Sequence, residues 1–428
     1  MIQNVQGSRK LRGTVELPPD KSISHRSAMF AAIAEGESRI ENYSDAADPQ
    51  STLSCLKQLG VQVESSDGYV RIQGVGRNGL QNPEQDLDCG NSGTTMRLLS
   101  GILSGAGVKC RLTGDESLSK RTMKRIITPL NSMGAKIEGR DGEYAPLQIE
   151  RGEGIRGIRY PLPIASAQLK SAVLLAGLFA DKETEIIETV PSRDHTERLL
   201  RLPVEVSGNT TFIRSNRNHP LPRQNYRIPG DFSAAAFWLV AGSIHPDAEI
   251  VLEDMGLNPS RTAALQILQQ MGADIEIAVK EDQFDEPMGT VTVRSSGLRA
   301  VKLDPSLIPN CIDELPILMV AMCFAEGRSE ITGASELRHK ETDRLHAMER
   351  LLSAAGEKFE MRADGIVIQG QGSHIPENTV YDSEHDHRIA MSAAVMALMA
   401  DGVSKIEHAE CTAISYPGFW SDLDRLTR

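Results

Sequence analysis

The sequence lacks the features that nucleic-acid-binding and membrane-spanning proteins need. Its 428 residues include only 9 Phe, 7 Tyr and 2 Trp, and 58 acidic residues outnumber 46 basic ones, for a formal net charge of −12. A negative chain with few aromatic rings neither attracts a phosphate backbone nor stacks bases, so we expect no nucleic-acid partner. The longest nearly apolar stretches, 315–325 and 389–400, are shorter than the roughly 20 residues that span a bilayer, so we expect no membrane partner.

The usual marks of disulfides, metals and cofactors are missing as well. The 6 cysteines form no C-x-x-C pair, which excludes a zinc ribbon and indicates reduced thiols. His385 and His387 have no partner at ligand spacing, so we expect no metal. No Gly-Lys-Ser/Thr loop occurs, and the glycine-rich segment 74–79 is not followed by a helix pattern, so we expect no cofactor. The first 13 residues contain no apolar run after their basic residues, which favours the cytoplasm.

What the sequence does contain is a repeat. The phrases LKQLGVQVE, LNSMGAKIE, LQQMGADIE and LLSAAGEKFE place a glycine at positions 60, 134, 272 and 356, and LLRLPVEV places Pro203 between the second and the third. The spacing is a multiple of about 70 residues. Each phrase predicts the end of an amphipathic helix, a left-handed glycine and an alternating strand.

A second, more apolar helix pattern precedes each phrase. These helices are apolar on nearly every face, so we expect them to be buried. Their predicted starts lie near Ser22, Asn91, Ala165, Asp231, Asp313 and Asp386.

Six such units predict an α/β protein with buried inner helices. Proline-containing segments at 18–20 and 228–231 exclude helix and precede two of the unit starts, so we expect the hinge there. Residues 19–228 then form one domain of three units. Residues 229–428 form a second domain of three units, which the N-terminal segment 1–18 completes.

Cations, amides and hydroxyls gather where the inner helices begin. Helix N-termini present unpaired N–H groups and a partial positive charge, so several such ends would bind a phosphorylated or carboxylated small molecule. Lys21, Arg26, Arg97 and Arg388 would strengthen that site.

The motifs at these positions resemble, in order and along essentially the whole chain, those of the 5-enolpyruvylshikimate-3-phosphate (EPSP) synthase family. The matching motifs are DKSISHR (20–26), GNSGTTMR (90–97), LTGDESLSKR (112–121), SAQLKSA (166–172), GDFSAAA (230–236), HKETDRL (339–345) and DHRIAM (386–391). The resemblance implies an inside-out α/β barrel-like fold of two domains, each with three βαβαββ units, that closes around its substrates. It also implies a monomer that transfers the enolpyruvyl group of phosphoenolpyruvate to the 5-hydroxyl of shikimate 3-phosphate and releases phosphate.

That addition–elimination needs a base, an acid and cations for the substrate anions. The resemblance implies that Asp313 accepts a proton, that Glu341 donates one and that Lys21 also takes part. Two plainer interpretations remain open: Asp313 could simply cap a helix, and Glu341 could simply form an i,i+3 ion pair with Arg344.

The resemblance also assigns the substrate ligands. Those for shikimate 3-phosphate are Lys21, Ser22, Arg26, Ser166, Ala167, Gln168, Ser192, Asp313 and Lys340. Those for phosphoenolpyruvate are Lys21, Gly93, Arg121, Gln168, Arg344 and Arg388. Gly93 is compatible with a tight turn and with close approach of the backbone to phosphate.

Three positions depart from the family pattern. Ile414 stands where many members carry a lysine, and Lys340 or Lys405 could compensate for the missing cation. His195 replaces a frequent tyrosine, and Glu336 occupies a place where asparagine occurs. Glyphosate sensitivity is favoured by Gly93 but obscured by the missing lysine.

Two other functions remain as alternatives. Enolpyruvyl transfer to UDP-N-acetylglucosamine is disfavoured, because Lys21-Ser22 stands where that family has Lys-Asn and no cysteine lies in a glycine-rich loop. A noncatalytic repeat scaffold that binds anions is the third hypothesis.

Overall fold

The chain divides into two compact units in the computed structural model, which describes residues 1–66, 68–283, 285–370 and 375–428. The inserted unit comprises residues 19–228 and 283–286, and the terminal unit comprises residues 1–18, 229–282 and 287–428. Two of the unit boundaries, 18/19 and 228/229, lie within the two proline-containing segments. The sequence did not indicate that residues 283–286 are grouped with the inserted unit.

Three four-stranded sheets of the inserted unit share one topology. In each sheet two strands run parallel and a hairpin adds two antiparallel strands, with the orders β14-β3-β5-β4, β6-β7-β9-β8 and β10-β11-β13-β12. Helices connect the strands, as parallel pairing requires. The strands are β3 (Glu35–Glu41), β4 (Gln62–Ser66), β5 (Tyr69–Val75), β6 (Leu87–Asp88), β7 (Cys110–Thr113), β8 (Lys136–Arg140), β9 (Tyr144–Glu150), β10 (Arg159–Pro161), β11 (Thr184–Glu188), β12 (Val204–Ser207), β13 (Thr210–Ser215) and β14 (Tyr226–Arg227). The helices are α1 (Lys21–Ile33), α2 (Ala47–Gln58), α3 (Gly93–Ala106), η1 (Leu118–Lys120), α4 (Lys124–Ser132), α5 (Ala167–Gly177) and α6 (His195–Leu200).

The terminal unit repeats this plan in one four-stranded sheet, whereas its other two sheets have three strands each. Its sheets have the orders β16-β17-β15-β2, β18-β20-β19 and β1-β22-β21. The strands are β1 (Ile2–Gln6), β2 (Leu11–Glu16), β15 (Ala248–Gly256), β16 (Asp274–Gln283), β17 (Glu286–Arg294), β18 (Gly327–Ile331), β19 (Lys358–Arg362), β20 (Gly365–Gly370), β21 (Val380–Asp382) and β22 (Val403–Glu407). The helices are α7 (Phe232–Ile244), α8 (Ala263–Gln270), η2 (Pro305–Leu307), α9 (Ile308–Cys311), α10 (Leu315–Cys323), η3 (Ser335–His339), α11 (Arg344–Ala354), α12 (His387–Ala397), η4 (Ala409–Ile414) and α13 (Phe419–Thr427).

Strands distant in sequence complete the first and last repeats of the chain. β14 pairs parallel with β3 and supplies the strand that the first repeat lacks. β2 pairs parallel with β15, and β1 pairs antiparallel with β22. The sixth unit departs locally from the repeat, because η4 and α13 follow β22 and β1 pairs with the edge of β22.

The glycines of the sequence repeat confirm the predicted helix ends. Gly60, Gly134, Gly272 and Gly356 have φ between +77° and +98° and follow α2, α4, α8 and α11. At the degenerate repeat the left-handed residue is Arg201, at φ +51°, since proline cannot adopt a positive φ.

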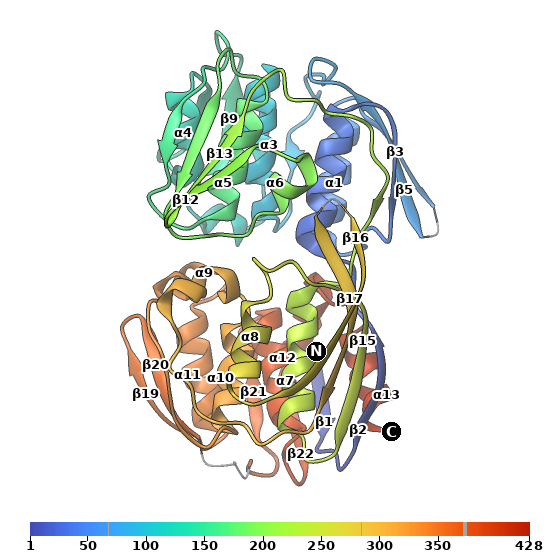
Figure 1. The fold of residues 1–428 in the computed structure, drawn as a ribbon, viewed down its shortest axis with the longest axis vertical. Helices are drawn as coiled ribbons and strands as arrows, with labels where there is room; N and C mark the ends of the chain where they lie inside the picture. Colours follow the sequence, from blue (N-terminus) through green and yellow to red (C-terminus); the bar gives the residue numbers. More distant parts are fainter. Residues whose placement is uncertain (67, 284, 371–374) are drawn as a thin grey trace. The chain divides into compact units, whose positions relative to one another are not determined.

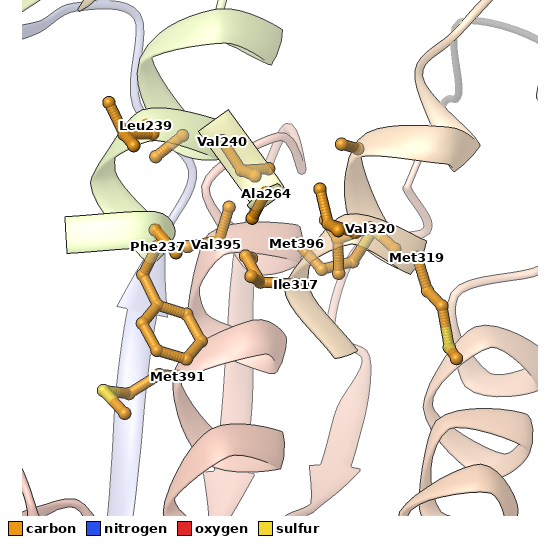
Figure 2. Close-up of a cluster of buried hydrophobic side chains, with 14 of the residues drawn as sticks. Phe237, Leu239, Val240, Ala264, Ile317, Met319, Val320, Met391, Val395 and Met396 are labelled. Atoms are coloured by element: carbon orange, nitrogen blue, oxygen red, sulfur yellow. The ribbon is translucent and has the colours of Figure 1, made fainter. Parts of the chain in front are cut away.

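The inner helices are α1, α3, α5, α7, α10 and α12, and each begins within two residues of its predicted start. Every residue of α7 and α10 is buried, and both helices pack with α12 (Figures 1 and 2). Sheets cover these helices, and strands such as β3 alternate buried and exposed side chains. The fold is therefore the predicted inside-out α/β type, with helices inside and sheets outside.

The apolar helices also bear on membrane insertion. Among the described residues no single helix is long and apolar enough to cross a membrane. The pair Pro305–Cys311 and Leu315–Cys323 reaches that length and composition only together, and it is bent by 117°.

Gly101 lies where α3 packs closely against α5 in the inserted unit. A Cβ added to Gly101 in α3 would lie 2.2 Å from the carbonyl oxygen of Ala172 in α5. One turn earlier on the same helices, Arg97 donates to Gln168 at 2.6 Å. The absence of a side chain at Gly101 therefore sets the spacing at which this hydrogen bond forms.

We expect Gly101→Ala to lower the free energy of unfolding by about 2 kcal/mol, because α3 and α5 must separate. Urea denaturation followed by circular dichroism measures the change. Gly297→Ala is the control, since its Cβ would meet no atom within 4 Å. Equal stability of the two variants would contradict the role of Gly101.

Candidate active site

Three inner helices of the inserted unit begin with side-chain caps. Asp20 accepts the N–H of Ile23 at 2.8 Å, and Ser92 accepts that of Thr95 at 3.1 Å. Ser166 accepts the N–H of Leu169 in the same way at 3.4 Å. Since each cap satisfies one N–H, the remaining donors and the helix dipole are available for an anion.

The starts of α3 and α5 are joined by a side-chain hydrogen bond. Arg97 donates to Gln168, which in turn donates to Thr94 at 3.0 Å. A Cβ on Gly93 would lie 2.8 Å from Nη1 of Arg97. Gly93 begins α3 and has no positive φ, so the space taken by the Arg97 guanidinium is what favours glycine here, and close approach of its backbone to phosphate stays a prediction.

Two further cations of the expected set are half-buried beside these helix starts. Lys21 donates from Nζ to Oδ2 of Asp48 at 2.9 Å. Arg121 donates to Oδ1 of Asn91 at 2.6 Å and to Oγ of Ser117 at 3.0 Å. Both side chains are thus held in place while they remain accessible.

Arg26 differs from these cations because its side chain is buried. It donates to Thr196 at 2.8 Å, to Ser171 at 3.1 Å and to the carbonyl of Ser22 at 3.0 Å. Burial lowers the pKa of Arg26 to about 10. In this structure Arg26 holds α1 against α5 and α6.

A buried ionic cluster that the sequence analysis missed holds Ser192. Lys170 contacts both carboxylate oxygens of Glu188 at 3.1 Å and Glu197 at 2.7 Å. Glu188 accepts both the N–H of Ser192, at 3.0 Å, and its hydroxyl, at 2.5 Å. Burial raises the pKa of Glu197 against the opposing effect of Lys170. The lysine within the apolar segment SAQLKSAVLLAG was the sequence signal for this cluster.

In the terminal unit, Asp313 lies among three cations. Its Oδ1 is 3.3 Å from Lys340 and 3.2 Å from Arg344, and its Oδ2 is 3.9 Å from Arg388. Arg388 also donates to the carbonyl oxygen of Asp313 at 3.1 Å. Glu314, not Asp313, occupies the N-cap position of α10 and makes no capping bond there. The alternative that Asp313 only caps a helix is wrong.

Arg344 joins three carboxylates. It donates from Nε to Asp386 at 2.8 Å, from Nη2 to Glu341 at 2.7 Å and from Nη1 to Asp313. Burial alone lowers the pKa of Arg344, but Asp386, Glu341 and Asp313 outweigh it and raise the pKa above its ordinary value. The predicted i,i+3 ion pair of Glu341 is confirmed, and the same guanidinium also brings Asp313 close.

Glu314, next to Asp313 in the sequence, is a buried carboxylate. It is fully buried and accepts the hydroxyl of Ser233, which also accepts Nη2 of Arg261 at 2.7 Å. Nη1 of Arg388 lies 3.8 Å from Glu314. The starts of α7, α10 and α12 are therefore connected through polar side chains.

The departures from the family pattern have different surroundings. Ile414 ends η4 and packs against the apolar core. Lys405 is on the exposed face of β22, whereas Lys340 contacts Asp313. His195 is buried and bonded through Nδ1 to Glu286 at 2.7 Å, and Glu336 is half-buried in η3.

Metal-binding groups and disulfide bonds are both absent from the part of the chain that the structure describes. Among the described residues no group of three or more His, Cys, Asp or Glu side chains is arranged to hold a metal ion. All six cysteines are buried, and none of them forms a disulfide bond in the structure described.

Comparison with known proteins assigns the family. The profile described as EPSP synthase (3-phosphoshikimate 1-carboxyvinyltransferase) matches residues 5–423. The chain belongs to the EPSP synthase family. Curated 3-phosphoshikimate 1-carboxyvinyltransferases of Salinibacter ruber and Prochlorococcus marinus are 51% and 49% identical to it, over 100% of both chains in each case.

Solved structures agree with this assignment. An EPSP synthase of Acinetobacter baumannii is 40% identical, with a TM-score of 0.88 over 99% of this chain and 98% of that one. The enolpyruvyl transferase NikO of Streptomyces tendae, 17% identical with a TM-score of 0.78 over 99% and 97%, shares the fold. As a member of the EPSP synthase family the protein is a transferase, and its reaction is carboxyvinyl transfer to shikimate 3-phosphate.

We expect Arg344→Lys to lower the free energy of unfolding by about 3 kcal/mol, because one ammonium cannot satisfy three carboxylates. Chemical denaturation measures the change. Arg350→Lys in the same helix is the control, since Arg350 is exposed and pairs with Glu384 at 2.8 Å near the surface. A loss of unfolding free energy for Arg344→Lys no larger than that of the control would contradict this role of Arg344.

Proposed function

We propose that Asp313 and Glu341 perform the proton transfers of an addition–elimination between phosphoenolpyruvate and shikimate 3-phosphate. Asp313 takes the proton of the 5-hydroxyl, and Glu341 protonates the methylene carbon of phosphoenolpyruvate. The observation that supports this most is the shared contact of both carboxylates with Arg344. Arg344 holds the two carboxyl groups close together, where Asp313 acts as the base in its ionised form and Glu341 acts as the acid when it carries a proton.

The proposed ligands follow from the helix starts. For shikimate 3-phosphate they are Lys21, Ser22, Arg26, Ser166, Ala167, Gln168, Ser192, Asp313 and Lys340. For phosphoenolpyruvate they are Lys21, Gly93, Arg121, Gln168, Arg344 and Arg388. Arginine forks bind carboxylate and phosphate in a bidentate manner, which supports the second set. Ser192 would have to exchange its bond with Glu188 to donate to phosphate.

The residues of both sets are divided between the two units. The inserted unit carries Lys21, and the terminal unit carries Asp313. We propose that the units close on the substrates and exclude water, with hinges at 18–20 and 228–231. Unchanged small-angle scattering on addition of both substrates would contradict closure.

The remaining proposals concern the location, the oligomeric state and the inhibition of the protein. We propose a cytoplasmic monomer that is a target of glyphosate, with Lys340 contributing the cation that Ile414 does not supply. Competition of glyphosate with phosphoenolpyruvate in the steady state tests the inhibitor, and equilibrium sedimentation tests the monomer.

Phosphate release from phosphoenolpyruvate by purified protein tests the function directly. We expect release with shikimate 3-phosphate and none with UDP-N-acetylglucosamine, the alternative that the family assignment does not support. Release with the nucleotide sugar alone would overturn the proposal. A folded protein that is silent with both acceptors would leave the anion-binding scaffold.

Asp313→Asn tests the proposed base. The variant keeps an oxygen for Lys340 and Arg344 but loses the carboxylate that accepts the proton, so we expect kcat to fall by about 10²–10⁴-fold while the variant stays folded at the assay temperature. Asp424→Asn, on the exposed face of α13, is the control and should keep full activity. More than a tenth of wild-type turnover in Asp313→Asn would refute the assignment.

A further inference from the structure

Helices α1 and α2 of the inserted unit are joined by two polar pairs one turn apart. Lys21 and His25 are four residues apart on α1, and Asp48 and Thr52 are four residues apart on α2. Lys21 contacts Asp48 at 2.9 Å, and Nδ1 of His25 lies 2.7 Å from Oγ1 of Thr52. The first pair is ionic and partly accessible, whereas the second is fully buried.

The buried pair continues to the start of α3. Oγ1 of Thr52 lies 2.8 Å from Oγ1 of Thr95, which donates to Oγ of Ser92 at 2.8 Å. Ser92 is the N-cap of α3 and directly precedes Gly93. His25, Thr52, Thr95 and Ser92 are each 0% exposed. A chain of four buried side chains thus connects the helix that carries Lys21 with the start of the helix that carries Gly93.

The hydrogen bonds that link these four side chains all run in one direction, with His25 as the first donor and Ser92 as the last acceptor. Oγ of Ser92 accepts both the N–H and the hydroxyl of Thr95, so Thr95 must accept from Thr52. Thr52 then accepts from His25, which requires the proton on Nδ1 and leaves Nε2 bare. Nε2 of His25 has no hydrogen-bond partner among the described residues, as suits an unprotonated nitrogen better than an N–H.

The surroundings keep the ring of His25 neutral. Burial lowers its pKa to about 3, Asp48 opposes this shift, and Lys21 and Arg26 add to it. A carboxylate in place of His25 would neutralise the nearby cations, and a cation would repel them. A neutral donor bonds to Thr52 and leaves Asp48 as the counter-ion of Lys21.

We propose that His25 is a positioning residue that, through Thr52 and Thr95, fixes the start of α3 at Gly93 relative to Lys21. This inference rests on the proposed function, in which Lys21 binds both substrates and Gly93 binds phosphoenolpyruvate alone. Lys21 keeps its contact with Asp48 when His25 is replaced, so the displaced group is the start of α3 at Gly93. Ser192, a proposed ligand of shikimate 3-phosphate, is held by the separate cluster around Lys170. Loss of the His25 chain should therefore affect phosphoenolpyruvate more than shikimate 3-phosphate.

Steady-state kinetics of His25→Leu and His25→Asn test the proposal. Leucine removes the donor at similar volume, and we expect the KM for phosphoenolpyruvate to rise by about 10-fold while that for shikimate 3-phosphate changes by less than about 3-fold. Asparagine restores an amide donor near the place of Nδ1 and should recover most of the wild-type KM. Equal increases for both substrates in His25→Leu, or no rescue by asparagine, would overturn the proposal.

A double-mutant cycle separates this role from general loss of packing. Thr95→Val breaks the same chain, so the double variant with His25→Leu should be no worse than either single variant. Ser100→Ala is the matched control in α3, because its buried hydroxyl bonds only to the carbonyl of Met96 one turn back. We expect that control to keep the wild-type KM, and additive effects of the two chain variants would refute the coupling.

The protonation state of His25 can be measured without turnover. Nitrogen NMR of the wild-type protein labelled in histidine should show the His25 ring protonated on Nδ1 only, from pH 5 to 8. A proton on Nε2, or titration near the ordinary pKa, would overturn the direction of the chain even in a fully active enzyme. If the wild-type protein showed this tautomer but released no phosphate, the proposed function would be refuted, whereas the hydrogen-bond direction from His25 to Ser92 would be supported.

Discussion

The structure depends on one constraint: six helices without a polar face are buried under sheets, and their first N–H groups must still find partners. The sheets cover the sides of these helices, so the polar groups are concentrated at the helix starts. Aspartate and serine caps satisfy part of the demand in α1, α3, α5, α7 and α12. What remains is a set of donors and partial positive charges suited to anions, before any basic side chain is considered.

The basic side chains at these helix starts are themselves buried or half-buried, which imposes a second requirement. A guanidinium or ammonium removed from water needs a carboxylate or several hydrogen bonds. Lys21, at the start of α1, therefore pairs with Asp48, and Arg344, at the start of the outer helix α11, pairs with Asp386. Within each unit these partners hold the cation in one orientation, which lowers the cost of positioning it for an anion.

Much of the fold could be predicted because it rests on local patterns. The repeated glycine after an amphipathic helix depends on φ > 0 at a single residue, and the glycines at 60, 134, 272 and 356 all adopt it. The starts of the inner helices follow from caps and from apolar runs. The sequence assigned the N-terminal segment to the second domain, but only the structure shows that β1 pairs with β22, because no local pattern encodes a pairing between the two ends of the chain.

The candidate site, like the fold, was determined partly by the sequence and partly by the tertiary structure. The sequence by itself determined the residue types at the helix starts, the order of the motifs and hence the family, because each motif is a contiguous segment with its own cap and cations. Only the tertiary structure decided which charges meet. Asp313 faces Lys340 and Arg344 instead of capping α10, Arg26 is enclosed by Thr196 and Ser171, and Lys170 holds the carboxylates near Ser192. These partners are 18 to 170 residues apart, and a buried charge selects its partner by distance and dielectric in the folded chain, not by position along the sequence.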